Sequence, residues 1–316
     1  MAATTNHRVD AEVAAAIAAT GEQAPALPPE DLEALRARGT AGQAFMAGLL
    51  APSPDVATAS FSTTADDAAT IELRWYAKRG SAPGSAVVYA HGGGMVLGTL
   101  DAYDTLLSSY VSSTGVPILS VDYRLAPEAR GATLARDVFA GVSWLIDHAT
   151  ELAVDPARVA IMGDSGGGGV AAGAAILARD RQLPLARQIL IYPMLDDRSV
   201  TADVSIEPYA TWTYDNNLTA WTAVLGEARG GRDVQPVAAP ARLENFRGLA
   251  SAYIEVGDLD IFRDEDILYA HQLARAGVPI ELHVHPGAPH GFERLAPQRQ
   301  LARRAIHDRT RVIQSL

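Results

Sequence analysis

Gly163-Asp164-Ser165-Gly166-Gly167 follows the apolar run 158–162 and leads into the small residues 170–175. An apolar run, a serine between glycines and a run of small residues predict a strand, a tight turn and a helix, with the serine at the turn. The flanking glycines let neighbouring backbone pass close to that serine. Its hydroxyl would lie at a helix N-terminus, where backbone N–H groups favour negative charge. The stretch therefore predicts a nucleophile elbow built around Ser165.

Short apolar runs alternate with helical patterns on both sides of this stretch. The expected strands cover residues 86–90, 117–121, 158–162, 187–192, 251–256 and 280–284. The expected helices cover residues 31–50, 134–148, 166–181, 264–276 and the chain from about 297. This alternation predicts one mostly parallel sheet with helices on both faces. Residues 71–76, where apolar and polar side chains alternate, are expected to pair with residues 56–62 as an antiparallel edge of that sheet.

Two regions lack this alternation. Residues 1–50 are rich in alanine and helical in pattern, and Gly39 and Gly42 loosen the stronger helix, 31–50. Residues 196–240 contain short helical pieces and several aromatic residues but no convincing strand. Both regions are therefore expected to lie outside the sheet.

The composition excludes several classes of function. Lys and Arg number 26 against 37 Asp and Glu, and the net charge of −11 argues against nucleic acid or an anionic membrane as a partner. The chain has no cysteine, which excludes disulfides, thiolate metal sites and a cysteine nucleophile. Acidic residues at positions 10, 12 and 22 interrupt the N-terminal alanines, and no stretch has the length of a membrane span. A cytoplasmic protein is expected.

A second glycine-rich motif, His91-Gly92-Gly93-Gly94, directly follows the expected strand 86–90. Consecutive glycines leave backbone N–H groups unshielded, which suits an oxygen atom that gains negative charge during a reaction. Taken alone, the motif is also typical of a flexible turn or a phosphate loop. Together with the serine turn, it indicates that Gly93, Gly94 and Gly166 supply the N–H groups of an oxyanion hole.

The serine turn has one competing interpretation. Gly166, Gly168 and Ala171 match a dinucleotide-binding fingerprint after a strand and at the start of a helix. That fingerprint normally opens the first strand-helix-strand unit, whereas several elements precede this one. It also leaves Ser165 without a role, so this interpretation is disfavoured.

A serine nucleophile needs a base to take its proton and an acid to orient the base. His290 lies in the loop after the strand 280–284, and Asp260 follows the strand 251–256, with Asp258 as the next choice. The order serine, aspartate, histidine is that of α/β-hydrolase triads. His283 and His285 would share one face of a strand, but no third metal ligand stands at a useful spacing, which disfavours a metal pair.

With these residues the chain resembles the bacterial hormone-sensitive-lipase-like (family IV) esterases of the α/β-hydrolase fold, from about residue 60 to the C-terminus. The resemblance rests on five ordered motifs: His91-Gly92-Gly93-Gly94, Asp122 to Glu128, Gly163 to Gly167, Asp260 with Arg263-Asp264-Glu265, and His290-Gly291-Phe292. It implies Ser165 as nucleophile, Asp260 as acid and His290 as base. It also implies oxyanion donors at Gly93, Gly94 and Gly166.

The resemblance further implies a domain division and a set of partners. A helical cap would consist of residues 1–50 and the insertion 196–240, over a catalytic core of residues 51–195 and 241–316. No metal or cofactor is implied, the partner is a small-molecule ester, and family habit allows a homodimer. Three departures affect rate and substrate range: Gly166 replaces the usual alanine, Ile261 the usual proline, and Met95 the usual aromatic residue.

The expected function is hydrolysis of short- to medium-chain or compact aromatic carboxylic esters through a covalent acyl-enzyme. Met95 and the aromatic residues of the insertion would line the substrate pocket, although the aromatic residues could equally form the core of the cap: Tyr209, Trp212, Tyr214 and Trp221. The same machinery would serve an amidase, formamidase or lactonase. A non-catalytic small-molecule binder on a hydrolase fold is the alternative from another class, and it is disfavoured because a candidate stands in each catalytic role.

Overall fold

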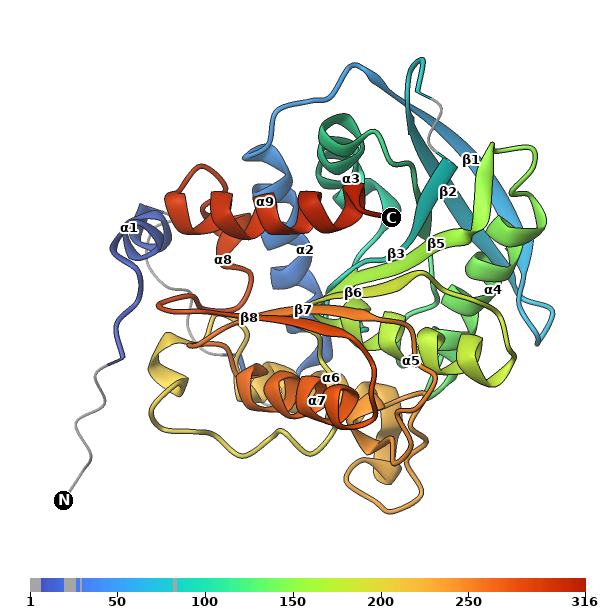
Figure 1. The fold of residues 1–316 in the computed structure, drawn as a ribbon. Coiled ribbons are helices and arrows are strands. Elements are labelled where there is room, and N and C mark those ends of the chain that lie inside the picture. The colour runs from blue at the N-terminus through green and yellow to red at the C-terminus, as the bar shows by residue number, and fades with distance from the viewer. Residues whose placement is uncertain (1–6, 20–26, 29, 82–83) are drawn as a thin grey trace.

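The structure, a computed structural model, describes residues 7–19, 27–28, 30–81 and 84–316. Across these residues the centre is an eight-stranded sheet in the order β1-β2-β4-β3-β5-β6-β7-β8 (Figure 1). Its strands are β1 (Val56–Thr64), β2 (Thr70–Lys78), β3 (Gly84–Ala90), β4 (Ile118–Val121), β5 (Val154–Asp164), β6 (Arg187–Ile191), β7 (Ala252–Gly257) and β8 (Ile280–His285). The strands from β3 to β8 run parallel, so the predicted mostly parallel sheet is confirmed.

The predicted antiparallel edge is also present. β1 pairs with β2 in a register that places Phe61 opposite Leu73, and β2 runs antiparallel to β4. β5 begins at Val154, earlier than predicted, because Val154 pairs with Gly84 before an irregularity in the β3–β5 register.

Helices cover both faces of the sheet (Figure 1). On one face lie α3 (Leu100–Thr114) and α9 (Gln300–Gln314), and on the other lie α4 (Thr133–Asp147), α5 (Gly166–Asp180) and α7 (Arg263–Arg275). Successive side chains of β3 pack into these two cores in turn, Val87 and Tyr89 against α3 and Val88 against α4 and α5. Burial on both faces explains why the parallel strands read as continuous apolar runs.

Sequence reasoning assigned no element to α3. Its buried residues stand three or four positions apart, which is the helical signal that the sequence offered: Leu100, Tyr103, Leu107, Tyr110 and Val111. Thr99 caps the helix by accepting a hydrogen bond from the N–H of Ala102. Ser and Thr residues in the last turn make the helical pattern less clear in the sequence. In the structure, the hydroxyls of Ser113 and Thr114 donate hydrogen bonds to the Tyr110 carbonyl.

The remaining helices are α1 (Ala11–Ala19), α2 (Leu32–Gly48), α6 (Tyr214–Leu225), α8 (Phe292–Leu295) and the short 3₁₀ segments η1 (Glu207–Tyr209), η2 (Gly226–Ala228) and η3 (Pro240–Arg242). α2 packs against α3 and α6, and the Glu30 N–H donates to the Thr219 Oγ1 across 2.9 Å. α1 instead packs against α8 and α9, where Val13 joins Phe292 and Leu301 in a separate core. Among the described helices, none is long and apolar enough to cross a bilayer.

Candidate active site

Ser165 occupies the sharp turn between β5 and α5. Its backbone has φ 55° and ψ −125°, a conformation that costs a non-glycine residue about 1–3 kcal/mol. The Ser165 N–H donates to the Ile191 carbonyl across 2.9 Å, which holds the turn against β6. Met95 and Tyr192 also have positive φ, of 65° and 36°. Backbone strain therefore gathers around this serine, as it does at many functional sites.

The structure brings Ser165, His290 and Asp260 together. The His290 Nε2 lies 2.9 Å from the Ser165 Oγ, and its Nδ1 lies 2.7 Å from the Asp260 Oδ2. Asp260 is fully buried, and its other oxygen accepts the Phe262 N–H. Asp258, the second choice for the acid, instead accepts the Gly287 N–H and anchors the loop that carries His290. This chain of hydrogen bonds can pass a proton from the serine to the imidazole.

Packing holds the imidazole of His290 in place. Tyr192 and Phe262 present their ring edges to it, with centroids 4.5 and 5.2 Å away. The Thr211 Oγ1 donates to the His290 carbonyl across 2.6 Å, which ties this loop to the insertion after β6. Two aromatic rings and the Asp260 carboxylate therefore hold the imidazole, and Thr211 holds the His290 backbone, which is the support that a base in this position needs.

Gly93 and Gly94 line the same cavity as Ser165 and His290. Their φ angles of 130° and 59° turn the peptide planes in a way that side chains rarely permit. Among the described residues, no group accepts a hydrogen bond from either N–H. The Gly166 N–H stands in the first turn of α5 and has no partner within its own helix. These N–H groups are available to an oxyanion.

The Gly166 backbone packs tightly against the loop that carries Gly93 and Gly94. A Cβ atom on Gly166 would lie 2.5 Å from the Met95 nitrogen, so an alanine would not fit without displacement of that loop. The glycine at this position, where the family that the sequence resembles usually has alanine, therefore fits the close packing of the two segments.

A buried carboxylate beside the serine escaped sequence reasoning. The Asp164 Oδ1 accepts the Gly92 N–H at 2.8 Å and the Tyr89 hydroxyl at 2.6 Å. Its Oδ2 accepts the Tyr103 hydroxyl at 2.8 Å and lies 3.5 Å from the Arg294 guanidinium. Burial, followed by the charge of Asp164, raises the pKa of Tyr89 well above its ordinary value. The sequence offered one sign of this role, an acidic residue inside the serine motif. Asp164 links the loop that carries Gly92, Gly93 and Gly94 (the glycine loop) to Arg294 of α8, the helix that follows His290.

The cavity in front of Ser165 has a volume of about 250 Å³. One wall comes from α2, through residues that include Leu35, Gly39, Gly42, Gln43 and Met46. Trp212 and Asn216 from the insertion, and Leu97 and Leu295 from the core, contribute further lining. Trp212 thus lies where the sequence analysis expected it, whereas no lining residue of α2 was named there, although residues 1–50 were expected to form part of a cap.

The other expected pocket residues lie outside the cavity lining. Met95 is buried with its side chain against α5, where its methyl group approaches Gly169. Tyr209 donates its hydroxyl to the His7 carbonyl, and Tyr214 begins α6. Trp221 is fully buried in the main core. The insertion therefore uses most of its aromatic residues for packing.

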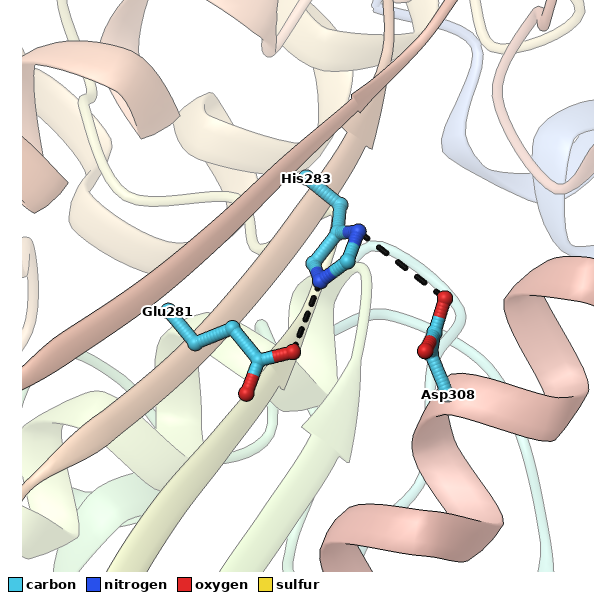
Figure 2. A group of neighbouring side chains, drawn as sticks. All are labelled: Glu281, His283 and Asp308. Atoms are coloured by element: carbon cyan, nitrogen blue, oxygen red, sulfur yellow. Dashed lines mark hydrogen bonds and ion pairs between the residues drawn. The ribbon is translucent and has the colours of Figure 1, made fainter.

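His283, the first of the two histidines on β8, lies beside two carboxylates (Figure 2). His283 lies 2.8 Å from Glu281 and 3.9 Å from Asp308, so α9 supplies the third group that the spacing did not reveal. The ring of His285 stacks 6.0 Å from that of His283. Arg311 contacts both Glu281 and Asp308. These carboxylates are therefore already paired with a cation, and the cluster is an ion-pair network in this structure.

Comparison with known proteins identifies the family to which this fold belongs. A family model described as alpha/beta hydrolase fold matches residues 87–294. An ethyl acetate hydrolase of Pseudomonas putida is 33% identical over 277 residues, which cover 85% of this chain and 86% of that protein. Esterase LipI of Mycobacterium tuberculosis is 37% identical over 210 residues, or 65% of each chain. Among solved structures, a bacterial heroin esterase superposes with a TM-score of 0.88 at 32% identity, covering 97% of both chains.

Proposed function

We propose that this chain acts on short- to medium-chain or compact aromatic esters, with Ser165 as its nucleophile. The chain belongs to the alpha/beta hydrolase fold family and is a serine carboxylesterase. The observation that carries the assignment of roles is the hydrogen-bonded chain from Ser165 through His290 to Asp260 at the edge of the cavity. The hormone-sensitive-lipase-like esterases that the sequence resembles have the same α/β-hydrolase fold as the matching family model.

In the first half of the reaction, the Ser165 Oγ attacks the ester carbonyl while His290 takes the hydroxyl proton. Asp260 holds the imidazole and stabilises the imidazolium that forms. The N–H groups of Gly93, Gly94 and Gly166 stabilise the oxyanion, and loss of one such donor typically costs about 3 kcal/mol. His290 then protonates the departing alcohol, which leaves an acyl group on Ser165.

In the second half, a water molecule attacks the acyl group while His290 takes its proton. The tetrahedral intermediate collapses, the carboxylic acid leaves, and His290 returns the proton to Ser165. This cycle consumes one ester and one water and requires no metal or cofactor.

The size of the cavity supports a small substrate. Its volume of about 250 Å³ lies below the ~300–1,000 Å³ typical of pockets for drug-sized ligands. We assign residues 1–50 and 196–240 to a cap over a core of residues 51–195 and 241–316, and the packing of α2 against α6 supports this division. The homodimer and the cytoplasmic location stay predictions, which size-exclusion chromatography and cell fractionation would test.

The test is hydrolysis of p-nitrophenyl esters of increasing acyl length by the wild type and by Ser165→Ala. Rapid turnover of short esters that falls by at least about 10³-fold in the variant would support the proposal. Turnover that survives the substitution would overturn the role of Ser165. Serine-dependent turnover of amides or lactones, but of no ester, would favour the alternative substrates of the same triad.

A further inference from the structure

The wall that α2 contributes to the cavity contains two glycines. Gly39 and Gly42 stand on one face of the helix with Leu35 and Met46, because positions four, seven and eleven residues apart share a face. Glycine inside a helix is unfavourable relative to alanine. Each glycine in this wall therefore calls for a structural reason.

Gly39 has such a reason in its packing. A Cβ atom there would lie 2.4 Å from the Leu97 Cδ2. Leu97 in turn belongs to the glycine loop, since its N–H donates to the Gly93 carbonyl at 3.1 Å. The absence of a side chain at Gly39 thus allows α2 to approach the proposed oxyanion hole.

Gly42 has no comparable packing partner. Within the described part of the chain, nothing lies within 4 Å of the position that its Cβ atom would take, yet Gly42 lines the cavity with Ser165 and His290. A side chain at this lining position would therefore meet no atom of the described residues at its Cβ.

We propose that Gly42 is a specificity-determining position, where the missing side chain leaves room for part of the ester and so sets the largest substrate that reaches Ser165. This inference rests on the proposed function. A larger side chain at position 42 would take up cavity volume and exclude the longer esters first. One methyl or methylene group in an apolar pocket changes the ratio of kcat/KM values for two substrates by about 10-fold or more, so the effect is measurable.

The experiment compares Gly42→Leu with the wild type on p-nitrophenyl acetate and on the longest p-nitrophenyl ester that the wild type cleaves well. We expect the ratio of kcat/KM for the long ester to that for the acetate to fall by at least about 10-fold. Gly42→Ala should shift the same ratio in the same direction by less. This smaller substitution keeps the test available if the leucine variant does not fold, as judged by its thermal unfolding.

Two control variants separate a change of specificity from general damage. Ala44→Leu adds the same side chain on an exposed part of α2 and should leave the ratio within about 2-fold of the wild type. Gly39→Ala should push Leu97 against the glycine loop and lower kcat for both esters alike, with the ratio preserved.

The outcomes distinguish this inference from the proposed function. A folded Gly42→Leu variant with an unchanged ratio would overturn the role of Gly42 while leaving the esterase assignment intact. A wild type that cleaves no ester would overturn the substrate assignment itself. A ratio that falls equally in Ala44→Leu would show that the effect is not specific to the cavity wall.

Discussion

Asp164 and Asp266 are both buried, with exposed fractions of 5% and 0%, but their surroundings are opposite. Asp164, beside the serine, accepts hydrogen bonds from three groups and faces Arg294. Asp266, in the first turn of α7, has no hydrogen-bond partner for either oxygen among the described residues. Burial, together with the nearby carboxylates of Glu265 and Asp260, raises the pKa of Asp266 well above its ordinary value.

Glu265 extends this contrast. Its Oε1 accepts the Leu195 N–H at 2.7 Å, its Oε2 has no partner among the described residues, and burial raises its pKa to about 8. The Asp164 carboxylate next to the nucleophile is thus satisfied, whereas the carboxyl groups at the start of α7 have buried oxygens without a partner among the described residues, which is unfavourable for the folded state. We expect changes in the first region to reduce activity and changes in the second to alter stability.

The largest effect is expected for Asp164→Asn. The amide keeps the shape but removes the negative charge, and Arg294 loses its buried counter-ion. Breaking such a pair typically costs about 3–5 kcal/mol, and an amide NH2 group that faces the guanidinium should displace Arg294 from the cavity lining and lower kcat. Urea unfolding and ester kinetics measure the two effects. Tyr89→Phe, which removes a single donor, should cost only about 1 kcal/mol, and an equal loss in both variants would contradict the role of the ion pair.

The next effect concerns the pH dependence of stability through Glu265. Its folded-state pKa of about 8 lies above its ordinary value of 4.5, so its contribution is fully present below pH 4.5 and is lost as the pH rises to about 8. The loss between pH 4.5 and pH 7 should be on the order of 3 kcal/mol. Glu265→Gln should flatten this part of the stability profile, measured by urea unfolding at a series of pH values. A profile that matches the wild type would show that another group is responsible.

A smaller effect is expected for Gly166→Ala. The added methyl group would meet the Met95 nitrogen at 2.5 Å, and such overpacking typically costs about 1–3 kcal/mol. Displacement of the loop should lower kcat for every ester. Gly48→Ala, at the end of α2 and outside the cavity lining, adds the same methyl group in open space and serves as the matched control. Equal kcat values in the wild type and Gly166→Ala would show that the loop tolerates the displacement.

The smallest effect is expected for Asp266→Leu, and it has the opposite sign. An apolar side chain of similar size removes two unpaired polar atoms from the interior, which should raise the free energy of unfolding by about 1 kcal/mol. Thermal unfolding at neutral pH measures the gain, with ester kinetics expected within about 2-fold of the wild type. A lower unfolding temperature would mean that Asp266 has partners that compensate its burial, such as buried water.

Much of the fold was predictable because its signals are local. The apolar runs of the parallel strands, the glycines around Ser165 and the order of the three candidate triad residues all appear within short windows. The structure places those three side chains within hydrogen-bond distance of one another. Helix α3 was missed although its pattern is also local, since its polar last turn hid the periodicity.

Other features depend on contacts between distant segments. Asp308 reaches His283 from another element, and Arg294 reaches Asp164 across 130 positions of the chain, so neither contact could be read from spacing. Met95 was expected in the pocket, but the backbone of its loop directs the side chain toward α5.

The sequence alone therefore determined the strands, the helices other than α3 that flank the sheet, the family, and which residues are chemically able to act, since these follow from local periodicity and motif. Only the tertiary structure decided which of them meet, which buried carboxyls find partners, and which glycine leaves space beside the serine. The physical reason is that burial and hydrogen bonding depend on neighbours from every element that packs at a point, and those neighbours are set by the whole fold.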